Sequence, residues 1–97
     1  MIDLTIDQES IIHAILKATV PDCEVMVFGS RISQHHKKYS DLDLAVRGIK
    51  RLSLLQLFEL KEKFAESSLH FRVDISDWNA FTPEFQKVIS SHLVKIQ

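Results

Sequence analysis

The chain has 97 residues, a length that predicts one domain spanning residues 1–97. Hydrophobic residues make up 45% and charged residues 26%, which is the balance of an ordinary globular protein. The net charge of −1 argues against a protein that binds nucleic acid in general or anionic membranes, because both classes carry a basic excess.

Cysteine content and apolar runs bear on where the protein works. Cys23 is the single cysteine, so no disulfide can form within the chain, which fits a reducing cytoplasm. The first residues lack the basic segment and apolar run of a signal peptide. No apolar stretch approaches the roughly 20 residues needed to cross a bilayer. We therefore expect a cytoplasmic protein without a membrane segment.

The first predicted element is a helix from about Asp7 to Thr19, capped by Asp7 or Thr5 and ended by Pro21. A short strand follows over Glu24–Phe28, where apolar residues alternate. The helix residues expected to face the core recur at helical spacing, and they are Ile11, Ala14, Ile15 and Ala18.

Two more strands and two more helices are predicted in the rest of the chain. The second strand spans Asp41–Arg47 and the third His70–Ser76, both with apolar residues on one face. A capping box begins the helix between them, with Ser53 and Gln56 satisfying each other's backbone amides. The last helix starts at Thr82-Pro83. The apolar face of the middle helix is expected to contain Leu54, Leu57, Phe58, Leu60 and Phe64.

The order of these elements is helix, strand, strand, helix, strand and helix. This order predicts a small α/β (α+β) domain, in which helices pack on a mixed sheet. The residues from His92 to Gln97 either extend the last helix or form a short edge strand, and the pattern leaves both open.

Two aspartates lie in the second predicted strand. Asp41 and Asp43 are two residues apart, so both point to one face while Leu42 points to the core. Carboxylates so close repel each other unless a cation or proton neutralises them. Such oxygen ligands suit magnesium, which proteins bind through one or two carboxylates plus substrate phosphates. A solvated strand face is the alternative, but the surrounding leucines indicate a central strand with one polar end.

A Gly-Ser turn precedes the aspartates. Phe28 ends a strand, and at Gly29-Ser30 the backbone can approach a ligand closely and offer amides to a phosphate. An ordinary turn explains this pair alone. The joint spacing is stronger, because ten residues separate Ser30 from Asp41. A chance match of this kind is expected in roughly one chain per thousand.

The stretches Val27–Arg31 and Tyr39–Val46 resemble the minimal nucleotidyltransferases of the polymerase-beta-like superfamily. The resemblance covers nearly the whole chain and implies the nucleotidyltransferase fold. It also implies that Gly29 and Ser30 hold the triphosphate of ATP. Arg31 would pair with a phosphate oxygen or, alternatively, with a surface acid.

The same resemblance implies a third carboxylate on a later strand. Asp74 fits because it lies on the strand face opposite Val73 and Ile75, whereas Asp77 is expected past the strand as a turn or helix-entry residue. Asp74 would bind metal or accept the proton of the attacking hydroxyl. Two magnesium ions, stabilising the attacking and leaving oxygens of an in-line displacement, would be held by Asp41, Asp43 and Asp74.

Basic and aromatic side chains near these motifs each have two interpretations. The segment His35–Lys38 would steer a triphosphate by its charge or form a solvated loop. Trp78 and Phe81 would pack in the core or against a partner, or else stack on a nucleobase.

Proteins that resemble this chain are paired with a small helical HEPN-domain protein. In such pairs the helical protein is a ribonuclease toxin, and the nucleotidyltransferase is the antitoxin that transfers AMP from ATP to a tyrosine of the toxin. Larger relatives complete the acceptor site with a further helical domain, so we expect a partner to supply the acceptor hydroxyl here. Neutralisation by binding alone and transfer to a small molecule or an RNA end stay open, as does a homo-oligomer.

Overall fold

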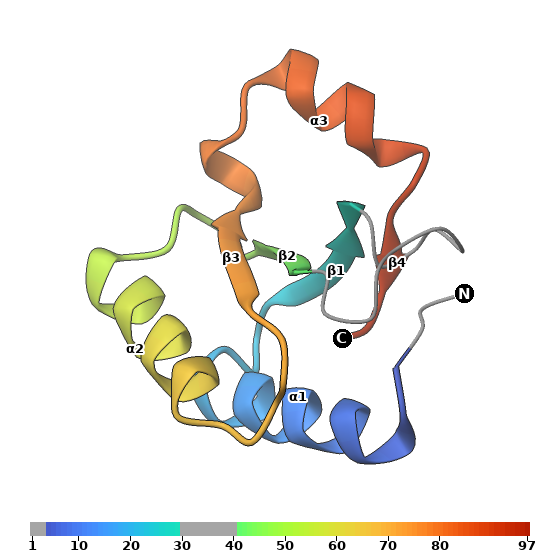
Figure 1. Ribbon diagram of the computed structural model, residues 1–97. Coiled ribbons are helices and arrows are strands. Elements are labelled where there is room, and N and C mark those ends of the chain that lie inside the picture. Colours follow the sequence, from blue (N-terminus) through green and yellow to red (C-terminus); the bar gives the residue numbers. More distant parts are fainter. Residues whose placement is uncertain (1–3, 30–40) are drawn as a thin grey trace.

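The structure is a computed structural model that describes residues 4–29 and 41–97. Within these residues a four-stranded sheet has the order β3-β2-β1-β4 (Figure 1). Strand β2 is antiparallel to β1 and parallel to β3, while β4 is antiparallel to β1. The mixed sheet confirms the predicted α+β class. The strands are β1 (Glu24–Phe28), β2 (Leu42–Arg47), β3 (Val73–Asp77) and β4 (Val94–Lys95).

The helices begin at the caps that the sequence contains. Helix α1 (Ile6–Thr19) starts after Thr5, whose hydroxyl accepts a hydrogen bond from the Gln8 amide at 3.1 Å while the Gln8 side chain accepts one from the Thr5 amide at 2.9 Å. Of the two predicted caps, the structure therefore has Thr5. This reciprocal pair satisfies two amides that the first turn leaves without helical partners.

The other two helices confirm their predicted starts. Helix α2 (Leu54–Ala65) begins after Ser53 with the predicted capping box to Gln56. A 3-10 turn, η2 (Trp78–Ala80), follows β3, and α3 (Pro83–Ser90) begins after Thr82, whose hydroxyl accepts from the Phe85 amide.

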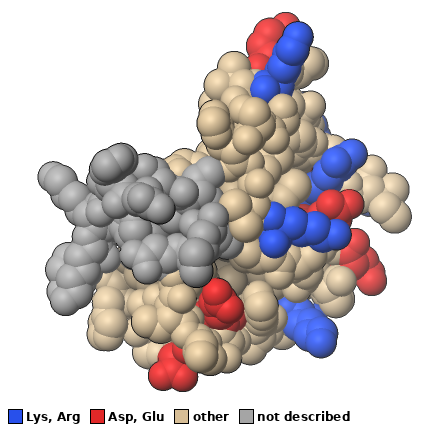
Figure 2. Space-filling model, turned by 90° about the vertical axis from the view of Figure 1, so that its right-hand side faces the viewer, with Lys and Arg blue, Asp and Glu red and all other residues tan. Residues whose placement is uncertain are grey.

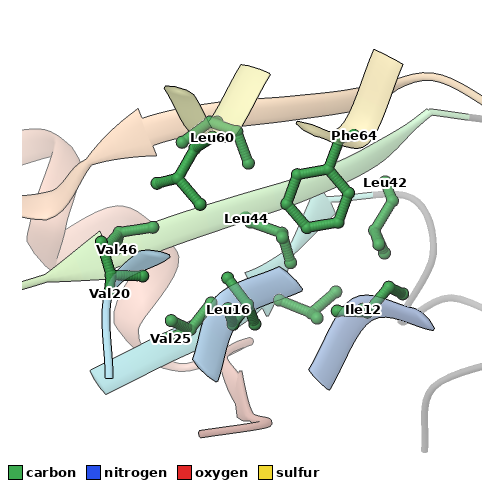
Figure 3. Packing of buried hydrophobic residues seen from close by; sticks show 11 residues of the cluster. Ile12, Leu16, Val20, Val25, Leu42, Leu44, Val46, Leu60 and Phe64 are labelled. Carbon is green, nitrogen blue, oxygen red and sulfur yellow. The ribbon is translucent and has the colours of Figure 1, made fainter. Parts of the chain in front are cut away.

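Helices α1 and α2 cover one face of the sheet and enclose the main core (Figure 1 and Figure 3). Ile12 and Leu16 from α1 meet Leu60 and Phe64 from α2 above the alternating apolar residues of the strands. Full burial of one such aliphatic side chain stabilises the fold by about 1.5–3 kcal/mol. The strand residues of this core are Val25, Val27, Leu42, Leu44, Val46 and Ile75.

The predicted helix faces were partly wrong. In α1 the buried stripe is Ile12 and Leu16, whereas Ala14 and Ala18 are exposed. The helix has apolar residues at several overlapping helical spacings, and the larger side chains take the buried positions because they remove more apolar area from water. In α2, Leu60 and Phe64 are buried as predicted, but Leu54 is 86% and Phe58 61% exposed.

The strands follow the predictions to different degrees. The range Glu24–Phe28 is confirmed, and β2 begins one residue later than predicted. The range His70–Ser76 was wrong at both ends, because β3 is confined to the residues that pair with β2, from Val73 to Asp77. The open question about the tail is answered, since part of it forms the edge strand β4.

The other face of the sheet carries η2 and α3, and α3 projects at the top of the molecule (Figure 1 and Figure 2). Three ring contacts link aromatic side chains here. Phe81 lies 6.0 Å from Phe28, 6.1 Å from Trp78 and 4.8 Å from Phe85, centroid to centroid. Edge-to-face rings at such distances stabilise the packing. Trp78 and Phe81 therefore hold the segment after β3 against the sheet.

The described surface has charges of both signs. On the face shown in Figure 2, lysine and arginine side chains lie among acidic ones, and the described residues form no continuous basic patch there. Within residues 4–29 and 41–97, no helix combines the length and the apolar character required to span a membrane.

Candidate active site

The structure brings Asp43 and Asp74 together. They are register partners on the adjacent parallel strands β2 and β3, which places their side chains on the same face of the sheet. Neighbouring strands lie about 4.8 Å apart, so one cation can reach both carboxylates. Asp41 stands just before β2, two residues from Asp43, and is half-buried. Three acidic side chains therefore gather at one end of the central strand β2 and the edge strand β3.

Asp77 lies at the opposite end of β3. Its register partner is Val46, and its carboxylate accepts hydrogen bonds from the amides of Leu52 at 2.7 Å and Asn79 at 3.0 Å. The prediction that Asp77 falls past the strand was wrong by one residue, because pairing with β2 extends β3 to this position. Its predicted role at a helix entry is confirmed, since it caps η2.

Gly29 follows β1 directly and closes one side of the acidic cluster. Its φ of +81° is in the left-handed region, which side chains disfavour. A Cβ atom at this position would fall on Oδ2 of Asp43, and Phe28, the residue before it, pairs with Asp43 across the sheet. Only glycine therefore lets the backbone pass this close to the carboxylate.

Three of the residues and segments considered above lie outside the described residues. They are Ser30, Arg31 and the basic segment His35–Lys38. Their proposed contacts with a triphosphate stay predictions.

The carboxyl group of Asp43 has a raised pKa. Partial burial is the largest cause, followed by the negative charges of Asp74 and Asp41, while the Arg72 cation acts in the opposite direction. An acid beside like charges favours its protonated form, and a nearby cation reverses this preference. The site thus concentrates negative charge that a bound cation would relieve.

Arg72 is a site residue to which the sequence prediction gave no role. Its Nε atom donates a hydrogen bond to Oδ1 of Asp74 at 2.8 Å, and its Nη2 atom forms an ion pair with the same oxygen at 2.7 Å. The pKa of Arg72 is raised, chiefly by this hydrogen bond and the charge of Asp74 and then by the charge of Asp41. The sequence indicated that Arg72 and Asp74 lie close together, because residues two apart in a strand share a face.

The donor set fits a hard divalent cation, although the carboxylates are not closed around one. No group of three acidic, histidine or cysteine side chains in the described part of the chain has the spacing of a metal site. Asp74 is engaged by Arg72 instead. The three aspartates nevertheless supply the oxygen ligands that magnesium takes, and their mutual repulsion is what such an ion removes. This arrangement is chemically able to bind a metal–triphosphate complex.

Solved structures with the same fold include two toxin–antitoxin complexes. One is described as a toxin–antitoxin structure with AMP-PNP. It matches with a TM-score of 0.76 and 24% identity over 92% of this chain and 72% of that chain. Another is described as a tri-AMPylated Shewanella oneidensis HEPN toxin in complex with MNT antitoxin. It matches with a TM-score of 0.69 and 23% identity over 92% and 68% of the two chains. At these identities the similarity establishes the fold.

Sequence comparison establishes the family. A relative from Haemophilus influenzae (strain ATCC 51907 / DSM 11121 / KW20 / Rd), named probable protein adenylyltransferase MntA, is 42% identical over 96 residues. The match covers 99% of this chain and 84% of the relative. The family model for polymerase beta nucleotidyltransferases matches residues 9–96. The chain therefore belongs to the polymerase beta nucleotidyltransferase family.

Proposed function

We propose that this chain transfers AMP from ATP to a hydroxyl group of a HEPN-domain toxin, with a tyrosine as the expected acceptor, and so acts as a cytoplasmic antitoxin. Two similarities support the proposal. The relative that is 42% identical is named a probable protein adenylyltransferase. One structure of the same fold contains a tri-AMPylated HEPN toxin with its MNT antitoxin.

The observation that carries the proposal is the register of Asp43 with Asp74 beside Gly29. Two carboxylates on the neighbouring strands β2 and β3, next to a backbone position that tolerates no side chain, form an acidic end of the sheet. An aspartate with a purely structural role would not require a residue without a side chain next to its carboxylate. Asp77, which has a structural role, takes two backbone amides instead.

In this proposal Asp41, Asp43 and Asp74 hold magnesium, and Gly29 with Ser30 and Arg31 holds the triphosphate. Bound there, magnesium would neutralise phosphate charge and stabilise the oxygens of the displacement. The backbone at Gly29 approaches the phosphates because it carries no Cβ.

The covalent change is one substitution at phosphorus. The acceptor oxygen forms a bond to the α-phosphorus, the bond from that atom to the bridging oxygen breaks, and pyrophosphate leaves. Asp74 accepts the proton of the acceptor hydroxyl. A carboxylate can do this when it lies within hydrogen-bond reach of the hydroxyl. Its place on the exposed side of β3, with 36% of the side chain exposed, leaves it open to an acceptor on another protein.

The experiment uses the purified chain, its HEPN partner from the neighbouring reading frame, magnesium and ATP labelled on the α-phosphate. We expect label on the partner and a mass gain of one or more AMP units on a tyrosine. The matched control is Asp41→Ala/Asp43→Ala protein, which should transfer no label. Equal labelling by the wild type and this variant would refute the enzymatic proposal, and a partner without added AMP would refute toxin modification.

Neutralisation by binding alone is the second candidate, and a specific surface favours it. Leu54, Leu55 and Phe58 on α2 are exposed by 86, 65 and 61%. Exposed apolar groups of this kind are typical of protein interfaces. The two candidates differ in cells: if Asp41→Ala/Asp43→Ala protein still protects against the toxin, binding suffices.

A further inference from the structure

The ion pair between Arg72 and Asp74 occupies a carboxylate that the proposed function assigns to a metal. Both recorded contacts of the guanidinium fall on one oxygen, Oδ1 of Asp74, at 2.8 Å from Nε and 2.7 Å from Nη2. The Arg72 side chain is 73% exposed. The cation is thus held by a carboxylate and not by surrounding packing.

The backbone of Arg72 is fixed at the same place. Its carbonyl oxygen accepts a hydrogen bond from the amide of Leu42 at 2.8 Å. Leu42 lies between Asp41 and Asp43, so the main chain of Arg72 is tied to the strand that carries the other two carboxylates. The side chain can rotate away from Asp74 while its origin stays beside the site.

We propose that the Arg72 guanidinium is the resident counter-ion of the acidic cluster and competes with a divalent cation for Asp74. The inference rests on the proposed function, because it takes the three aspartates as metal ligands. Exposed ion pairs are weak, so an ion with two charges can displace the guanidinium. Arg72 therefore lowers the affinity of the site for metal while it limits the repulsion among Asp41, Asp43 and Asp74.

A purely orienting role for Arg72 makes the opposite prediction. If the guanidinium served to hold Asp74 in the geometry that a metal needs, its removal would weaken metal binding. If it competes for the same oxygen, its removal strengthens metal binding. The sign of the change in the dissociation constant therefore separates the two roles.

The test measures binding of Mn²⁺, as a probe for magnesium, to the full chain by electron paramagnetic resonance of the free ion. We expect Arg72→Gln to bind Mn²⁺ roughly two- to fivefold more tightly than the wild type, the range expected for loss of an exposed ion pair. The matched control is Arg47→Gln, which removes one exposed positive charge at the far end of β2. It should change the dissociation constant by less than about 1.5-fold.

A second pair of variants tests whether the effect passes through Asp74. In an Asp74→Asn background, Arg72→Gln should no longer tighten Mn²⁺ binding, because the two changes act on one interaction. Weaker or unchanged Mn²⁺ binding by Arg72→Gln, or full tightening in the Asp74→Asn background, would overturn the inference.

A wild-type chain that binds no Mn²⁺ would refute the metal-dependent function, and the inference with it. AMP transfer is measured separately, so a failure of the inference alone leaves that result intact.

Discussion

The two ends of β3 treat an aspartate in opposite ways. Asp77 is 6% exposed and accepts hydrogen bonds from two fixed backbone amides, those of Leu52 and Asn79. Asp74, three residues earlier, is 36% exposed in its side chain and is paired with an exposed arginine. Around Asp77 a second contact joins the Asn79 side chain to the Gly48 carbonyl at 3.0 Å.

This difference separates a structural carboxylate from one available to a ligand. A ligand cannot replace the two backbone amides at Asp77 without local unfolding. The carboxylate of Asp77 therefore stabilises the connection between β2 and α2. A side-chain cation in solvent exchanges readily, so the charge of Asp74 stays accessible. Four predictions on three substitutions, taken from the largest expected effect to the smallest, test this distinction.

Asp43→Asn should have the largest effect, on activity. The change removes a charge from the centre of the cluster while keeping the size of the side chain. We expect AMP transfer to fall at least about 1000-fold, equivalent to about 4 kcal/mol in the activation barrier. Labelled ATP and the HEPN partner provide the measurement. Activity within tenfold of the wild type would show that the site lies elsewhere.

Gly29→Ala should come next, because its Cβ would fall on Oδ2 of Asp43. We expect a loss of transfer of about 100-fold, near 2.7 kcal/mol, from the displaced carboxylate and the strained backbone. Circular dichroism should show a folded protein. The control is Gly48→Ala, whose Cβ would meet its nearest neighbour at 3.2 Å, away from the aspartates. Equal losses in both variants would contradict the role given to Gly29.

Asp77→Asn should lower the stability of the fold and leave AMP transfer nearly unchanged. An amide in place of the carboxylate leaves one of the two backbone donors without an acceptor, which costs about 2 kcal/mol. For a domain of this size the melting temperature should fall by about 8–16 °C. Transfer by the folded protein at low temperature should stay within about twofold of the wild type. A large loss of transfer without loss of stability would revive Asp77 as a site residue.

The smallest effect should be a gain in stability for Asp43→Asn without metal. The pKa of Asp43 is raised in the fold by burial and by Asp74 and Asp41, so the folded state holds its proton more tightly than the unfolded chain. The wild type therefore loses stability as pH rises from the unfolded pKa, about 3.9, through the folded pKa.

The variant should gain less than about 1 kcal/mol at neutral pH, because solvent screens the repulsion at this part-exposed position. This corresponds to a rise of less than about 8 °C in melting temperature, absent below about pH 4. Thermal unfolding at pH 3.5 and pH 7 without divalent cations measures both. A loss of stability at pH 7 would contradict the repulsion inferred for the cluster.

Much of the local structure was predictable because short-range rules govern it. The caps at Ser53 and Thr82 depend on a few neighbouring residues, and both are present as predicted. Glu24–Phe28 was identified as a short apolar strand with Val25 and Val27 on one face, and its bounds are confirmed. The placement of Asp74 on the face away from the core also followed from alternation, and its pairing with Asp43 agrees with that expectation.

Features set by tertiary pairing were not predictable in the same way. The sequence shows no sign of which strands run parallel, yet pairing with β2 decides that β3 ends at Asp77. Apolar residues of α2 lie at helical spacing whether or not the sheet reaches them, so Phe58 was wrongly assigned to the core. Arg72 was given no role although it lay in the predicted strand, because alternation places it on the same face as Asp74 but does not show that the two side chains pair.

The pairing of β4 with β1 joins two segments that lie far apart in the sequence. The Gln97 side chain donates to the carbonyls of Val20 and Cys23 at 2.9 and 3.1 Å, and its own carbonyl accepts from the Val25 amide at 3.1 Å. Joining segments so far apart in sequence carries a large loop-closure entropy, so this edge should close late. Until β4 pairs with it, β1 offers an unpaired edge to other chains. The rate at which β4 docks on β1 would then influence how much of the protein escapes aggregation.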